Sequence, residues 1–242
     1  MTAAQDLRAR ARADLVAAIK ASAATQLASV GAAALSLRAV ARDLGLASSA
    51  LYRYFPSRDA LLTALIVDAY DAVGAVAEQA EDAARTRGGS PGERWLAVCR
   101  AVRGWAVAHP HEYALVYGSP VPGYAAPADT VEPAVRLSRV MARVLLDAAG
   151  EGTLRVPARP LPGPRLVTPA VLEVVGGAPG APYEDLLERS FVLLTALVGT
   201  TSYLLFGHLK EVLTDDDAWF DVAMAVAAEG VGLDLPLGPR TV

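Results

Sequence analysis

The stretch LSLRAVARDLGLASSALYRYFPSRDALL, residues 35–62, decides the fold of this chain. Four of its apolar residues recur at i, i+3, i+4 and i+7 and so share one helical face: Leu37, Val40, Ala41 and Leu44. Gly45 follows directly, and glycine ends helices readily because it takes a left-handed backbone conformation without a steric penalty. The pattern therefore predicts a short helix and a tight turn.

A second short helix is predicted to start at Ser48 or Ser49, because serine suits the first position of a helix. Leu51 and Phe55 share one of its faces at i and i+4. The opposite face offers hydroxyl, phenol and guanidinium groups: Ser49, Tyr52 and Arg53. Such groups can bond phosphates and base edges in a major groove, so we expect a helix-turn-helix.

A long third helix is predicted to follow Pro56, which cannot continue the preceding one. Ser57 can cap the new helix, and Asp59 lies in its first turn, where the helix dipole favours an anion. No breaker stronger than Gly74 occurs before about Arg85. At about 1.5 Å per residue, roughly 25 residues span close to 40 Å, which is long enough to link two domains.

The pattern L-S-L-R-x-V-A-x-x-L-G-L-x-x-S-A-L-Y-R-Y-F-P-S-R-x-A-L-L resembles the amino-terminal domain of TetR-type transcriptional regulators. The resemblance implies that Tyr52 and Tyr54 bond phosphates, while Arg58 and the amides near Ser57 hold the DNA backbone. The candidates for base edges are Arg38, Ser48, Ser49 and Arg53. An alternative stays open for the aromatic residues, since Tyr and Phe near helix ends are usually part of a core.

We expect an all-α protein with two parts. Residues 1–60 would form an amino-terminal three-helix DNA-binding domain, whose first helix covers about 3–29, and residues 61–242 a larger helical domain for effector binding and dimerisation. Residues 1–60 hold eight basic and four acidic residues, a net of +4, although the whole chain carries −4. A basic head on an acidic body suits a protein that presents one end to phosphates.

Three of these eight basic residues lie at the start of the first helix: Arg8, Arg10 and Arg12. Such an arm can contact phosphate or the minor groove, or it can be a solvated run of charge.

A helix is predicted at about 91–108, followed by an aromatic segment with Gly and Pro. The order Trp105, His109-Pro110, Tyr113, Tyr117-Gly118 and Pro120 is similar to the carboxy-terminal domain of one TetR subgroup, which Trp, His and Gly positions define. A ligand cavity lined by aromatic side chains is expected in this domain. The candidates are Trp105, His109, Tyr113, Tyr117, Tyr203 and Phe206, and each could equally belong to the core or an interface.

The rest of the chain is predicted to be helical except for residues 150–182, where seven prolines and six glycines exclude all but a turn at about 170–175. A loop of this length should be mobile, or alternatively a lid. Helices are expected at about 131–149, 183–212 and 215–229, the last capped by Thr214. The helix from 183 is apolar nearly all round and needs cover on both sides, so residues 183–229 predict a homodimer.

Other functions find little support in the sequence. No metal-binding Cys/His spacing, phosphate-binding glycine loop or nucleophile motif occurs, so we expect no cofactor, no metal site and no enzyme activity. Cys99, the single cysteine, is expected to be a buried inert thiol, with a redox sensor as the alternative. No window has the flanks of a membrane span, and a cytoplasmic location is expected.

The function predicted from the sequence is that of a ligand-responsive transcriptional repressor, released from a palindromic DNA operator by a small apolar or aromatic molecule. A ligand-independent repressor or an activator needs the same recognition residues and stays open. A helical enzyme or lipid-handling protein with a basic head is the alternative from another class.

Overall fold

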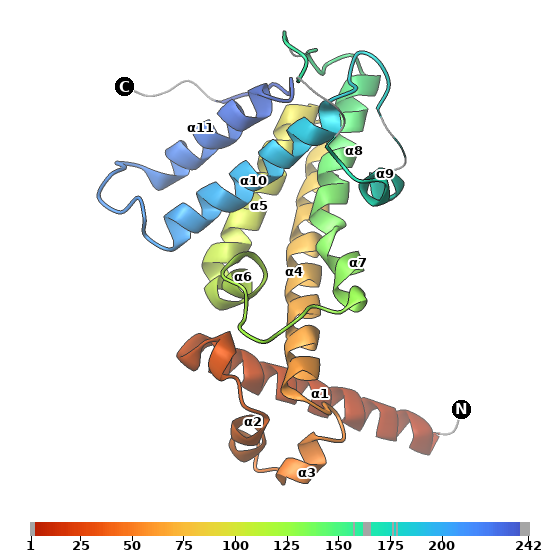
Figure 1. Ribbon diagram of the computed structural model, residues 1–242, viewed down its shortest axis with the longest axis vertical. Helices are drawn as coiled ribbons and strands as arrows, with labels where there is room; N and C mark the ends of the chain where they lie inside the picture. Colours follow the sequence, from red (N-terminus) through yellow and green to blue (C-terminus); the bar gives the residue numbers. More distant parts are fainter. Residues whose placement is uncertain (1–2, 157, 162–165, 176, 178, 238–242) are drawn as a thin grey trace. The chain divides into compact units, whose positions relative to one another are not determined.

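The computed structural model describes residues 3–156, 158–161, 166–175, 177 and 179–237, and all regular structure within them is helical (Figure 1). The all-α prediction is therefore confirmed. The chain divides into two compact units, of which unit 1 holds residues 1–71 and 109–134 and unit 2 holds residues 72–108 and 135–242. This division follows contacts and not function, so the functional boundary at residue 60 stays a prediction.

Unit 1 is built around the amino-terminal helices. Its elements are α1 (Ala3–Val30), η1 (Ala32–Ala34), α2 (Leu37–Asp43), α3 (Ser48–Leu51), the first part of α4 (Arg58–Thr86), α6 (Pro110–Tyr117), η2 (Ala128–Thr130) and α7 (Val131–Ala134). Its core forms where the apolar faces of α1, α2, α3 and α4 meet, and Ile19, Leu51 and Leu61 are fully buried there. The predicted first helix is confirmed.

Unit 2 contains the remainder of α4 together with α5 (Pro91–Ala108), α8 (Arg136–Gly150), α9 (Pro169–Val175), α10 (Leu186–Leu205) and α11 (Asp216–Glu229). Helix α10 packs against α11, α5 and α8, as Figure 1 shows for the pair α10 and α11. Trp95, Leu193 and Phe220 are completely buried in this unit.

Helix α4 is the one helix of the described residues that is long and apolar enough to cross a membrane by length and composition. The same pattern is typical of a core helix. Leu61 and Leu62 of α4 are fully buried, and Leu65 and Ile66 are each only 6% exposed. Because these side chains pack in the core of unit 1, α4 is a core helix.

The predicted end of α10 at residue 212 is wrong, because the helix ends at Leu205. Gly207 has φ +76°, and its amide donates to the Leu204 carbonyl while the His208 amide donates to the Tyr203 carbonyl at 2.9 Å. This is a Schellman motif, in which a glycine in the left-handed conformation closes the helix. The apolar periodicity continues past Gly207, so the sequence pattern alone does not reveal where the helix ends.

Two smaller predictions also need correction. Asp215, not Thr214, caps α11, and its carboxylate accepts from the amides of Asp217 and Ala218, each at 2.9 Å. The helix expected at 131–149 is interrupted at Val135, which separates α7 from α8. The predicted turn near 170–175 is confirmed as α9. Residues 157, 162–165, 176 and 178 of the 150–182 loop lie outside the described residues, so its mobility stays a prediction.

Candidate nucleic-acid interface and effector site

The turn after α2 has the geometry that the sequence predicts. The Ser36 hydroxyl caps α2 by accepting from the Ala39 amide at 3.5 Å. Gly45 has φ +65°, and the Leu46 amide beyond it donates to the Ala41 carbonyl at 2.8 Å. The predicted helix end at Gly45 is confirmed, and it fixes the direction in which the chain enters α3.

Helix α3 is short and is anchored by two apolar side chains. It begins at Ser48 as predicted, but its N-cap is Ala47 and no side chain caps it. Leu51 is fully buried and Phe55, in the turn that follows, is 8% exposed. The serine hydroxyls are thus not used as caps, and both serines face solvent.

The residues predicted to contact DNA are mostly exposed. Ser48, Ser49, Tyr52 and Arg53 are exposed on α3 and its following turn, and Arg38 is exposed on α2. Tyr54 differs, because its ring is half-buried against the core of unit 1. The Arg12 guanidinium of α1 lies over that ring, 5.0 Å from its centroid. Sequence reasoning missed this contact, since nothing local links residues 42 positions apart.

Arg58 holds its own domain together in this structure. Its Nη2 donates to the Ala32 carbonyl at 2.8 Å and to the Ala33 carbonyl at 3.2 Å, and its Nη1 donates to Asp59 at 3.3 Å. These bonds tie η1 to the start of α4, which Ser57 caps by accepting from the Ala60 amide at 3.0 Å. Part of the Arg58 guanidinium is therefore already hydrogen-bonded within the protein and is not free for a DNA phosphate.

Two of the six candidate ligand residues meet within unit 1. Tyr113 is fully buried, and its ring centroid lies 5.1 Å from that of Tyr117. Tyr70 of α4 meets Tyr117 edge to face at 6.0 Å and donates its hydroxyl to the Val116 carbonyl at 3.3 Å. Burial raises the pKa of both Tyr117 and Tyr70 above the usual 10.0, so both phenols stay neutral. Sequence reasoning missed Tyr70 because it lies inside an apolar helical run.

The other four candidates differ from one another in burial. His109 is exposed at the N-cap of α6, where its carbonyl accepts from the Tyr113 amide at 2.9 Å. Trp105 is buried in unit 2. Tyr203 and Phe206 are 56% and 45% exposed at the end of α10. Their exposure fits a surface role, and their part in ligand binding stays a prediction.

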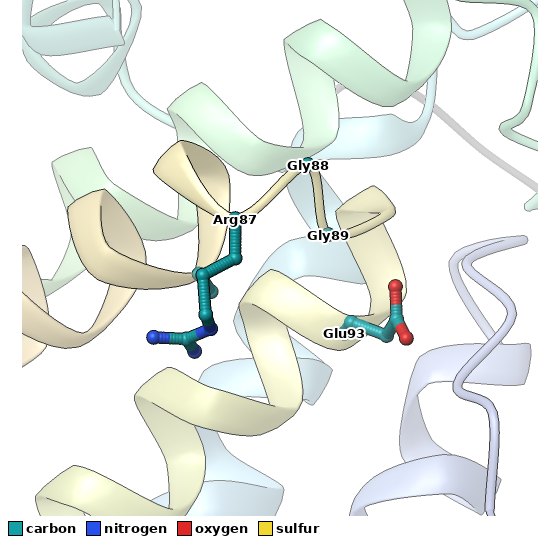
Figure 2. Close-up of a pocket in the computed structure, with 5 residues that line it drawn as sticks. Arg87, Gly88, Gly89 and Glu93 are labelled. Atoms are coloured by element: carbon teal, nitrogen blue, oxygen red, sulfur yellow. The ribbon is translucent and has the colours of Figure 1, made fainter.

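A pocket of about 250 Å³ lies at the loop between α4 and α5 (Figure 2). Its lining consists of Ala84, Arg87, Gly88, Gly89 and Glu93. None of the six candidate ligand residues belongs to it. Glu93 accepts from the Ser90 amide at 2.7 Å, while the Ser90 hydroxyl accepts from the Glu93 amide at 3.3 Å. This capping box lowers the pKa of Glu93. The pocket is polar, and the Glu93 carboxylate in its lining already caps α5.

No group of three or more His, Cys, Asp and Glu side chains among the described residues could hold a metal ion. Cys99 is completely buried.

Two family models match the chain. Residues 19–65 match the model described as bacterial regulatory proteins, tetR family, and residues 95–227 match the model described as tetracyclin repressor-like, C-terminal domain. The HTH-type transcriptional regulator Rv1816 of Mycobacterium tuberculosis is 40% identical over 210 residues, which cover 84% of this chain and 88% of that protein. The regulator Mb1846 of Mycobacterium bovis matches equally well.

Solved structures agree with these matches. The regulatory protein SCO4313 superposes with a TM-score of 0.68 at 30% identity, over 91% of this chain and 98% of that one. A protein from Rhodococcus sp. RHA1 gives the same TM-score at 24% identity, over 90% and 95% of the two chains, and shows the fold alone. With its helix-turn-helix and its two matched domains, this chain belongs to the TetR family of DNA-binding bacterial transcriptional regulators.

Proposed function

We propose that the protein is a dimeric repressor that binds a near-palindromic operator and is released from it by a small apolar or aromatic molecule. One observation carries the DNA half of this proposal. The outward side of α3 is polar and exposed, while Leu51 and Phe55 anchor its inward side in the core. A short helix that is fixed from behind can enter a major groove without losing its shape.

Within this proposal the exposed groups have distinct tasks. Arg53 is best suited to a guanine, because a guanidinium can donate two bonds to O6 and N7. Arg38, Ser48 and Ser49 are the other candidates for base edges. Contacts to phosphate fix the register of the helix and carry no sequence information. We assign these to Tyr52 and Tyr54, with the unused donors of Arg58 and the amides near Ser57 as support.

The proposed dimer uses α10 and α11. Regulators of this family act as dimers. These two helices and the residue that ends α10 leave large apolar side chains exposed: Phe191, Val192, Tyr203, Phe206, Trp219 and Val226. Such a face needs cover, and a second copy of the same two helices would complete a four-helix interface with twofold symmetry.

Two substitutions by aspartate test the proposed dimer interface. Val192 and Val226 are 62% and 65% exposed, so changing both to Asp should leave the fold intact and shift the protein to a monomer in sedimentation. Val107→Asp is the matched control, because Val107 is 60% exposed on α5. A double variant that sediments like the parent would place the interface elsewhere.

The effector site is proposed in the aromatic part of the carboxy-terminal domain. Support comes from the resemblance of Trp105, His109 and Gly118 to the Trp-His-Gly subgroup, and from the contact of Tyr113 with Tyr117. An effector releases DNA only if it binds the DNA-free state more tightly than the DNA-bound state. A ligand-independent repressor and an activator remain the alternatives. Family membership points away from an enzyme, and we place the protein in the cytoplasm.

The proposed function is tested by selection from a randomised pool of DNA duplexes with the full-length protein. We expect a site with twofold symmetry whose halves lie one helical turn of about 34–36 Å, or a multiple of it, apart. Recovery of no preferred sequence would overturn the repressor proposal.

A second experiment tests effector release. A panel of phenols and fused-ring aromatics is screened by thermal shift, and every compound that raises the melting temperature is added to the protein–DNA complex. We expect at least one such compound to weaken binding. If stabilising compounds instead tighten binding, release is wrong, and if none stabilises the protein, regulation is independent of this class of ligand.

A further inference from the structure

The start of α1 extends beyond the core of unit 1. Residues 7–14 are all exposed, and Leu7 is 70% exposed. Full burial begins only at Ile19, which is followed one turn later by Ala23, also fully buried. Residues 7–14 therefore do not contribute to the core, and their side chains are available to a partner.

Two arginines continue the buried stripe into this extension. Arg12 precedes Ile19 by seven residues and Arg8 precedes it by eleven, and both spacings return to nearly the same face of an α-helix. The side of α1 that carries Ile19 and Ala23 over the core thus carries guanidinium groups where the core ends.

The opposite side of the extension has a different charge. Asp6, Arg10 and Asp14 follow one another at spacings of four, so they share a face and sum to a charge of −1. Arg10 stands two residues from both Arg8 and Arg12, about 200° around the helix from each. The extension thus has one face of charge +2 and another of charge −1.

The contact between Arg12 and Tyr54 shows where the +2 face points. The Arg12 guanidinium lies 5.0 Å from the centroid of the Tyr54 ring, just after the exposed groups of α3. Arg8 lies one turn further out, about 6 Å along the helix axis, which is the rise of roughly two phosphates along one DNA strand.

We propose that Arg8 and Arg12 form a second phosphate-binding surface, which engages the DNA backbone beside the base pairs that α3 reads. This inference rests on the proposed function, because it needs DNA at α3. Arg12 adds its charge to this surface and also holds the half-buried Tyr54 ring in position. Arg8 provides a contact to phosphate that no residue of α2, α3 or α4 supplies. Contacts of this kind strengthen binding to every sequence equally.

The test compares Arg8→Gln with Arg10→Gln, which remove the same charge from two exposed positions of one helix. Binding is measured between about 50 and 200 mM salt, because phosphate contacts weaken over that range. The substrates are the duplex selected by the parent and a random duplex of equal length. Each lost phosphate contact lowers the salt slope by about 0.9, so a dimer should lose roughly 2 in Arg8→Gln. We expect about a tenfold or greater loss of affinity near 100 mM salt, and little change in Arg10→Gln.

Two results separate failure of this inference from failure of the proposed function. If Arg8→Gln and Arg10→Gln share one salt slope while the parent still selects a duplex, the second surface is wrong and the repressor proposal stands. If the parent selects no duplex, both are wrong. Trimming the selected duplex to the base pairs that α3 covers should abolish the difference between the variants, and a difference that persists on the trimmed duplex would also contradict the proposal.

Discussion

Arg94 of α5 donates from Nε to Oε1 of Glu81 of α4 at 2.7 Å, and neither side chain is more than 3% exposed. Arg94 also donates from Nη2 to Asp147 of α8 at 2.6 Å, and Arg143 lies 2.5 Å from the second oxygen of Glu81. Burial alone lowers the pKa of Arg94, but its bonds with Asp147 and Glu81 outweigh burial and raise it. This ion cluster joins three helices of unit 2.

Removing Arg94 should therefore be costly. Arg94→Met leaves Glu81 buried with a weaker set of partners, and loss of one member of a buried pair costs about 3–5 kcal/mol of unfolding free energy. Arg100→Met is the control, because Arg100 is 58% exposed in its pair with Asp221 and such pairs contribute about 1 kcal/mol or less. Urea unfolding measures both. If Arg94→Met and Arg100→Met lose the same unfolding free energy, the buried cluster stabilises the protein no more than an exposed ion pair does.

Gly45 and Gly104 should respond to alanine with opposite signs. A side chain at either position meets no atom within 4 Å, but Gly45 has φ +65° whereas Gly104 lies within helix α5. The left-handed conformation costs alanine about 1–2 kcal/mol, so Gly45→Ala should destabilise the protein. Gly104→Ala should stabilise it by about 0.5–1 kcal/mol, as thermal unfolding will show. A neutral Gly45→Ala would mean that the turn can adopt another geometry.

Glu78 should contribute to unfolding by acid. Arg136 donates to its two carboxylate oxygens at 2.9 and 2.6 Å and lowers the pKa of Glu78 from the usual 4.5, although burial opposes the shift. A lowered pKa in the folded state gives stability that is present above pH 4.5 and lost as the pH falls through the folded value. Glu78→Gln should flatten the acid limb of a stability–pH curve. Glu173→Gln, which removes an exposed carboxylate on α9, is the control. Identical acid limbs for Glu78→Gln and the parent would be evidence against this coupling.

Cys99 should not react in the folded protein. Burial, followed by the nearby negative charge of Asp221, raises the pKa of its thiol well above 9.0, and the thiolate is the reactive form. We expect no labelling by a thiol reagent at pH 8 until the protein is unfolded. Because the folded thiol holds its proton longer, stability should also fall as the pH rises above 9.0. Rapid labelling of native protein would revive the redox-sensor alternative.

The parts of the fold that rest on local signals could be predicted from the sequence. The turn at Gly45, the cap at Ser57 and the start of α5 after the glycine-rich loop each depend on a few neighbouring residues. The end of α10 shows the limit of such signals. There, Leu209 and Val212 extend the apolar period beyond Gly207, although the glycine has already closed the helix.

Contacts between distant segments were beyond the reach of sequence patterns. The approach of Arg12 to Tyr54 and of Tyr70 to Tyr117 depends on how α1, α4 and α6 pack in unit 1. For the same reason the exposed DNA-contact candidates were easier to find than an effector site, because a helix face is local and a cavity is assembled from several elements.

The central claim, that the outward face of α3 reads DNA, is tested most directly by Arg53→Ala. Affinity for the selected duplex is measured for this variant, with Arg87→Ala of the α4–α5 loop as an equally charged and exposed control. We predict that Arg53→Ala loses about 1–3 kcal/mol of binding free energy and relaxes the preference at one base pair, with unfolding unchanged. Binding by Arg53→Ala that is as tight and as selective as that of the parent would contradict the claim.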